Sequence, residues 1–87
     1  MAFEVLLSRA AAKELDALPR AAYQAIRKKL KGLGEEPFPE GCVKLEEDLY
    51  RIRIGEYRAV YSILSEPDRL LVVRVARRSE KTYRRLK

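Results

Sequence analysis

The sequence predicts a single α+β domain spanning residues 1–87, with the element order β-α-α-β-β-β-α and the helices packed on one face of an antiparallel sheet. Two patterns predict this fold. Apolar residues recur every three or four positions in residues 9–33, which is typical of helices, and they alternate with polar residues over much of residues 48–76, which is typical of strands. A chain of 87 residues can form one small core but not two.

The first half of the chain predicts one strand and two helices. Residues 3–7 form a short apolar strand, and Ser8 is a residue type favoured at a helix N-cap. The first helix covers residues 9–18, and Pro19 suits the first turn of a second helix that ends near Leu33. One apolar stripe joins both helices: Ala11, Leu15, Leu18, Ala22, Ile26, Leu30 and Leu33.

The second half predicts most of the sheet. Gly32 and Gly34 end the second helix, and residues 35–41, rich in proline and glutamate, form an extended loop. Three strands are expected over about residues 48–54, 57–64 and 69–76. A short helix is expected from about Glu80 to the end of the chain.

The net charge of +6 is concentrated in the second half. Residues 1–43 hold seven cations and six anions, whereas residues 44–87 hold twelve cations and seven anions. Arginine supplies 12 of the 19 cations, and its planar guanidinium can bind phosphate through two hydrogen bonds. This distribution favours a nucleic acid, an anionic membrane or an acidic protein as partner.

Cysteine content and hydropathy indicate the cellular compartment in which the protein works. The single cysteine, Cys42, allows no internal disulfide, and the chain has no histidine to activate it as a nucleophile. We expect Cys42 to act as a small buried hydrophobe. No apolar run approaches the roughly 20 residues of a membrane span, and no signal-peptide pattern is present. We therefore expect a cytoplasmic protein that does not bind membranes.

The most informative segment is residues 50–61, where apolar and cationic residues alternate. Successive side chains of a strand point to opposite faces, so Arg51 and Arg53 share one face. Gly55 stands at the first central position of a two-residue connection, as a type II′ turn requires, and the returning strand carries Arg58. Because neighbouring like charges destabilise a sheet, we interpret this face as a binding site for a polyanion.

The chain resembles the RelE/ParE superfamily of toxin–antitoxin systems, in particular its RelE-like mRNA interferase toxins. The segments that carry the resemblance are Leu18-Pro19, Pro37-x-Pro39-x-Gly41 with Lys44-Leu45, residues 50–61, and residues 75–83. Together they span essentially the whole chain in the family's order of elements. Residues 50–61 are the most specific of these segments.

The resemblance implies an activity and its partners. RelE-like toxins of type II systems cut mRNA in the A site of the 30S ribosomal subunit without a metal or other cofactor. The 2′-hydroxyl of the RNA attacks the adjacent phosphate, which leaves a 2′,3′-cyclic phosphate and a free 5′-hydroxyl. The resemblance also implies a cognate RelB-like antitoxin. Because the antitoxin usually carries the DNA-binding domain, we expect no sequence-specific DNA binding by this chain alone.

Matching positions imply five catalytic residues: Arg51, Arg53, Arg58, Arg78 and Tyr83. Arg51 and Arg53 replace lysines of the best-known member. Since arginine is not deprotonated in proteins, these two would act on the 2′-hydroxyl electrostatically. Arg58 and Arg78 would stabilise the charge of the transition state. Tyr83 would orient the substrate, although its spacing from Arg78 differs by one residue from several relatives, and packing on the sheet is the alternative.

Several other polar residues allow both a functional and a structural interpretation. Glu56 and Glu80 are candidate proton acceptors, with turn or salt-bridge roles as the favoured alternative. Seven further cations are predicted to bind RNA or phosphate: Lys28, Lys29, Lys31, Lys44, Arg74, Arg77 and Lys81. Arg77 stands where many relatives have histidine. The helix lysines also fit a solvated face. Three tyrosines are expected to pack in the sheet rather than to stack on bases: Tyr50, Tyr57 and Tyr61.

Two alternative functions remain open. A ParE-like toxin of the same fold would inhibit DNA gyrase, and retention of the four matched arginines counts against it. A catalytically decayed, nucleic-acid-binding homologue is compatible with the replacement of lysine by arginine at positions 51 and 53. The fold alone does not separate these functions.

Overall fold

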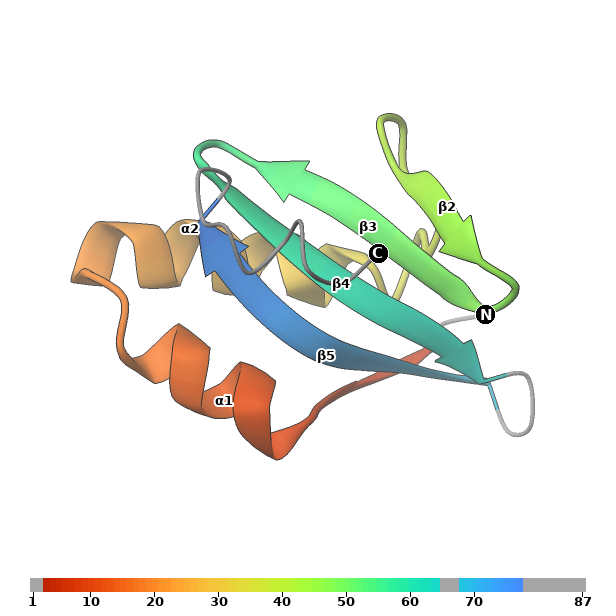
Figure 1. Cartoon of the computed structure of the whole chain (residues 1–87), viewed down its shortest axis with the longest axis horizontal. Coiled ribbons are helices and arrows are strands. Elements are labelled where there is room, and N and C mark those ends of the chain that lie inside the picture. Colours follow the sequence, from red (N-terminus) through yellow and green to blue (C-terminus); the bar gives the residue numbers. More distant parts are fainter. Residues whose placement is uncertain (1–2, 65–67, 78–87) are drawn as a thin grey trace.

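The computed structural model describes residues 3–64 and 68–77 (Figure 1). In chain order the elements are β1 (Glu4–Leu7), α1 (Arg9–Asp16), α2 (Arg20–Gly32), β2 (Val43–Glu46), β3 (Leu49–Ile54), β4 (Tyr57–Leu64) and β5 (Arg69–Arg77). Among these residues, two helices cover one face of a five-stranded sheet, so the predicted α+β class is confirmed. The helix expected from Glu80 lies outside the described residues.

The strand order of the sheet is β1-β5-β4-β3-β2. The pairs β2–β3, β3–β4 and β4–β5 are antiparallel, but β1 runs parallel to β5. The sheet is therefore mixed rather than purely antiparallel, which corrects the predicted sheet. The direction of β1 relative to the last strand depends on how the intervening helices return the chain, and no local pattern records it.

The sequence patterns also miss β2. All four residues of this edge strand are exposed, so it has no apolar face to produce an alternating pattern. Its pairing with β3 is irregular, because Lys44 lies opposite Tyr50 and Glu46 lies opposite Leu49, which leaves Leu45 as an extra residue. A short, bulged and exposed strand leaves little hydrophobic signal in the sequence.

The predicted helices are present. The Ser8 hydroxyl accepts a hydrogen bond from the backbone N–H of Ala11 at 3.0 Å and caps α1 as expected. α1 ends at Asp16 rather than at Leu18, because a residue that precedes proline disfavours helical backbone. α2 then begins directly after Pro19.

The core lies between the helices and the sheet. Its buried residues are Ala11, Leu15, Ile26, Leu30, Leu33, Ile52, Ala59, Tyr61, Leu70, Val72 and Val75. The Tyr61 hydroxyl donates to the Pro37 carbonyl at 2.7 Å, and the Tyr61 ring stacks on Tyr50 with 5.9 Å between centroids. Tyr50 and Tyr57 pack against the core, so all three tyrosines occupy the predicted sheet-packing positions.

Two further expectations can be compared with the structure. Cys42 is half-buried rather than fully buried. In residues 3–64 and 68–77, no helix has the length and apolar character needed to cross a membrane.

Candidate functional site

The β3–β4 hairpin positions three arginines. Gly55 has a φ of +61° and connects the strands together with Glu56, as the sequence predicts. The cross-strand register places Arg53 opposite Arg58 and Arg51 opposite Val60. Residues directly opposite in an antiparallel pair share a face, so all three guanidinium groups originate on one face of the sheet.

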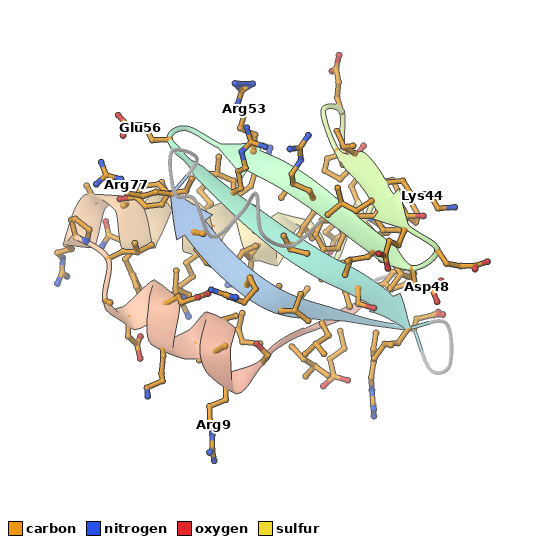
Figure 2. All side chains as sticks on the ribbon, in the orientation of Figure 1. Arg9, Lys44, Asp48, Arg53, Glu56 and Arg77 are labelled. Atoms are coloured by element: carbon orange, nitrogen blue, oxygen red, sulfur yellow. The ribbon has the colours of Figure 1, made fainter. Side chains whose placement is uncertain are left out.

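This face is the one turned away from the helices. The residues between the arginines, Ile52 and Ala59, form a cross-strand pair that is 2% and 0% exposed on the helix side. We name the opposite surface the open face and define it by Arg51, Arg53 and Arg58. Figure 2 shows Arg53 projecting away from the sheet beside the hairpin.

The open face concentrates positive charge. Arg53 is exposed, whereas Arg51 and Arg58 are half-buried. Arg53 and Arg58 are direct cross-strand neighbours, an arrangement of like charges that destabilises a sheet. No carboxylate of the described residues forms an ion pair with Arg53. A multiply charged anion bound across these groups would relieve their repulsion and accept hydrogen bonds from several guanidinium N–H groups.

Arg74 is held elsewhere. The register places it opposite Val60, next in line with Arg51, but its guanidinium contacts Glu14 of α1. Both Nε and one terminal nitrogen of Arg74 lie 2.7 Å from the same Glu14 oxygen. The hydrogen bond that Arg74 donates to the Glu14 carboxylate raises the pKa of Arg74. This ion pair competes with any role for Arg74 in binding phosphate.

Arg77 lies at the hairpin end of β5. It is opposite Tyr57, with its guanidinium carbon 5.9 Å from the centre of that ring and a terminal nitrogen 3.3 Å from Glu56 (Figure 2). Both charged side chains are exposed, so the ion pair itself contributes little stability. The contact gives Glu56 the salt-bridge role that the sequence favoured for it.

The predicted lysines lie away from the open face. Lys44 is opposite Tyr50, which packs on the helix side of the sheet, and Figure 2 shows Lys44 well separated from Arg53. The exposed lysines 28, 29 and 31 belong to α2, on the other side of the sheet. Lys28 and Lys29 line a hollow of about 310 Å³ between α2 and Ile54.

The structure therefore brings together three of the five predicted catalytic residues. Arg78 and Tyr83, and with them Glu80 and Lys81, lie outside the described residues. Sequence reasoning missed Glu14, whose partners Arg74 and Val75 lie far along the chain. Glu14 stands in an alanine-rich helix beside the apolar stripe, and no local signal distinguishes it from an ordinary surface acid.

Comparison with known proteins gives the class. A family model described as the ParE toxin of type II toxin–antitoxin systems, parDE, matches residues 5–82. The chain belongs to this toxin family, within the RelE/ParE superfamily.

Individual relatives carry the RelE name. A Methanocaldococcus jannaschii protein named RelE1 is 28% identical over 89 residues, which cover 97% of this chain and 98% of the relative. The Pyrococcus horikoshii RelE–RelB complex contains a chain with 30% identity and a TM-score of 0.82, covering 92% and 99% of the two chains. A chain of the Mycobacterium tuberculosis RelBE2 toxin–antitoxin complex has 26% identity and a TM-score of 0.80, covering 90% and 100%.

Proposed function

We propose that this toxin is a metal-independent endoribonuclease that cuts mRNA in the ribosomal A site. The observation that carries the proposal is the cross-strand pair of Arg53 and Arg58 beside Arg51, on the sheet face away from the helices. Clustered guanidinium groups repel one another, which a bound anion relieves, and they can stabilise the charge that develops on a phosphodiester under attack. The RelE names of the relatives also favour RNA cleavage.

The proposed reaction uses the nucleophile of the substrate. The 2′-oxygen forms a bond to the adjacent phosphorus, and the bond from phosphorus to the 5′-oxygen breaks. The 2′-proton leaves to solvent, and the departing 5′-oxygen gains a proton. Arg51 and Arg53 lower the pKa of the 2′-hydroxyl through their charge. Glu56 does not serve as the base in this scheme, because it is paired with Arg77 at the hairpin end.

Arg58 and Arg78 stabilise the transition state in this proposal. Negative charge on the phosphate oxygens increases as the 2′-oxygen attacks, so fixed guanidinium groups bind the transition state more tightly than the ground state. Arg58 is suited to this role because its strand is central in the sheet, between β3 and β5. Arg78 is assigned by its match to the family, and Tyr83 is proposed to orient the substrate.

We also propose a RelB-like antitoxin as the cognate partner. The relatives from Pyrococcus horikoshii and Mycobacterium tuberculosis were solved as toxin–antitoxin complexes. An acidic, amphipathic antitoxin would complement the net charge of +5 in residues 44–87. A cytoplasmic location is part of this proposal, because a toxin that acts on ribosomes would meet them there.

A second candidate is inhibition of DNA gyrase, which the ParE description of the family model favours. The two activities can be separated in one experiment. Purified toxin is added to translating ribosomes and to a gyrase supercoiling reaction, and mRNA ends are mapped by primer extension. Discrete cuts with a 2′,3′-cyclic phosphate support the proposal. Inhibited supercoiling without cuts identifies a ParE-like toxin, and neither effect identifies a decayed homologue.

A further inference from the structure

β5 contains a bulge directly beside the open face. Val60 lies opposite Arg74, and the next residue, Tyr61, lies opposite Val72. Two residues of β4 thus face three residues of β5, and Val73 is the extra one. A bulge of this kind changes which face the following side chains occupy.

The bulge decides what lies next to Arg58. In the structure Val72 and Val75 are both buried, at 0% and 3% exposure, and Ala76 lies opposite Arg58. If the same residues paired in a regular ladder without the bulge, Val73 would lie opposite Val60, Val75 would lie opposite Arg58, and Arg74 would turn toward the core. Burial of an unpaired guanidinium would be costly, and a β-branched side chain would replace a methyl group beside Arg58.

α1 secures the bulge from the other side. β1 pairs with β5 only as far as Val72, and in the part of the chain that the structure describes no other strand lies beside the following residues on that edge. The Ser8 backbone N–H donates to the Val72 carbonyl at 2.9 Å, and the Ser8 hydroxyl donates to the Val73 carbonyl at 2.9 Å. One oxygen of Glu14 accepts from the Val75 N–H at 2.7 Å, and the other holds Arg74.

We propose that Glu14 is a positioning residue for the open face. It fixes the strand just after the bulge by accepting from the Val75 N–H, and it draws the Arg74 guanidinium toward α1. Glu14 thereby keeps Ala76 beside Arg58 and holds the Arg74 guanidinium away from the arginines of the hairpin. Its effect on RNA cleavage rests on the proposed function, whereas its effect on the strand register does not.

A matched control comes from the same strand. Glu4 of β1 forms an exposed ion pair with Arg69 of β5, with 3.4 Å between the charged atoms, at the end of β5 away from the bulge. Glu4→Gln and Glu14→Gln therefore remove the same charge from an acid paired with a β5 arginine. Of these two variants, only Glu14→Gln should disturb the bulge. Glu14→Ala additionally removes the acceptor for Val75.

The first readout is independent of catalysis. Hydrogen exchange and chemical shifts are measured by NMR in the wild type and in the three variants. We expect faster exchange at the Val75 amide in Glu14→Ala, loss of the protected Nε proton of Arg74 in both Glu14 variants, and shifted resonances at Ala76 and Arg58. Glu4→Gln should leave all of these unchanged. Unaltered resonances in the Glu14 variants would overturn the proposal.

The second readout is cleavage in saturated ribosome complexes. Displacing a catalytic group lowers the rate about 10- to 100-fold, and we expect a loss of this size in the cleavage rate of Glu14→Ala. Its affinity for RNA should be unchanged or tighter, because Arg74 is released. The double variant Glu14→Gln/Arg74→Gln should recover part of the cleavage rate that is lost in Glu14→Ala, because the two neutral amide side chains can hydrogen-bond to each other. A wild-type rate in Glu14→Ala, or a lower rate without faster exchange at Val75, would overturn the proposal.

The proposed ribonuclease function and the positioning role of Glu14 can be rejected independently of each other. If the wild type cuts no RNA, the proposed function is wrong, and the NMR readout alone decides the role of Glu14 in the register. If the wild type cuts RNA and Glu14→Ala cuts equally well, the nuclease assignment stands and the positioning role of Glu14 is rejected. Where Glu14→Ala fails to fold, Glu14→Gln still tests the role of Glu14 through the protected Nε proton of Arg74 and the resonances of Ala76 and Arg58.

Discussion

Two cationic regions lie on opposite sides of the sheet and differ in how they hold their charge. The open face carries arginines on paired strands, with the backbone of each fixed by a neighbouring strand. The α2 surface carries lysines 28, 29 and 31 on the exposed side of a helix. Rigidly placed guanidinium groups can be aimed at a developing charge, whereas mobile ammonium groups provide general attraction. We therefore propose that the open face provides the chemistry and that the α2 lysines provide affinity.

The largest effect tests whether the open face acts on a 2′-hydroxyl at all. A message with 2′-deoxyribose at the cut site should bind the toxin–ribosome complex normally and should not be cleaved, because the nucleophile is absent. Cleavage is followed by primer extension, and the unmodified message provides the control. Cleavage of the deoxy message would remove the basis for the mechanism and for assigning chemistry to the open face.

The next effect measures the contribution of a single guanidinium. Arg58→Ala and Arg78→Ala should each lower the rate of saturated complexes by about 10²–10³-fold, or about 3–4 kcal/mol, as loss of one transition-state donor does. Arg58→Lys should recover only part of the rate, because lysine keeps the charge without the planar fork. If both alanine variants retain full toxicity when expressed in growing cells as soluble protein, these residues are not catalytic.

Much of the open face could be predicted because its determinants are local. The alternation around Arg51 and Arg53 predicts the strand, and Gly55 predicts the turn. A two-residue turn between the strands then places Arg53 opposite Arg58. The remaining features depend on contacts between distant segments. The parallel pairing of β1 and the contact of Glu14 with Arg74, which are 60 residues apart, have no signature in either segment. The bulge at Val73 is equally hidden within an apolar run.

The pH dependence tests whether the arginines work without a titrating base. The chain has no histidine, so no side chain has an ordinary pKa near about 6.5. The single-turnover rate should rise toward alkaline pH or reach a plateau, with no inflection near neutrality. The measurement is the cleavage rate in saturated complexes across pH. A bell-shaped profile centred near neutrality would mean that this mechanism is wrong or that a carboxylate with a strongly shifted pKa takes part.

The smallest expected effect concerns α2. Replacing lysines 28, 29 and 31 by glutamine should weaken ribosome binding and flatten its dependence on salt, by about 0.7 in the logarithmic slope for each lysine that contacts a phosphate. The saturated cleavage rate should stay at the wild-type value, because α2 lies on the other side of the sheet from Arg58. Glutamine has a helix propensity similar to that of lysine, so a change in binding reports the lost charge. A lower saturated rate in this variant would mean that both regions contribute to the chemistry, and the division between affinity and catalysis would no longer hold.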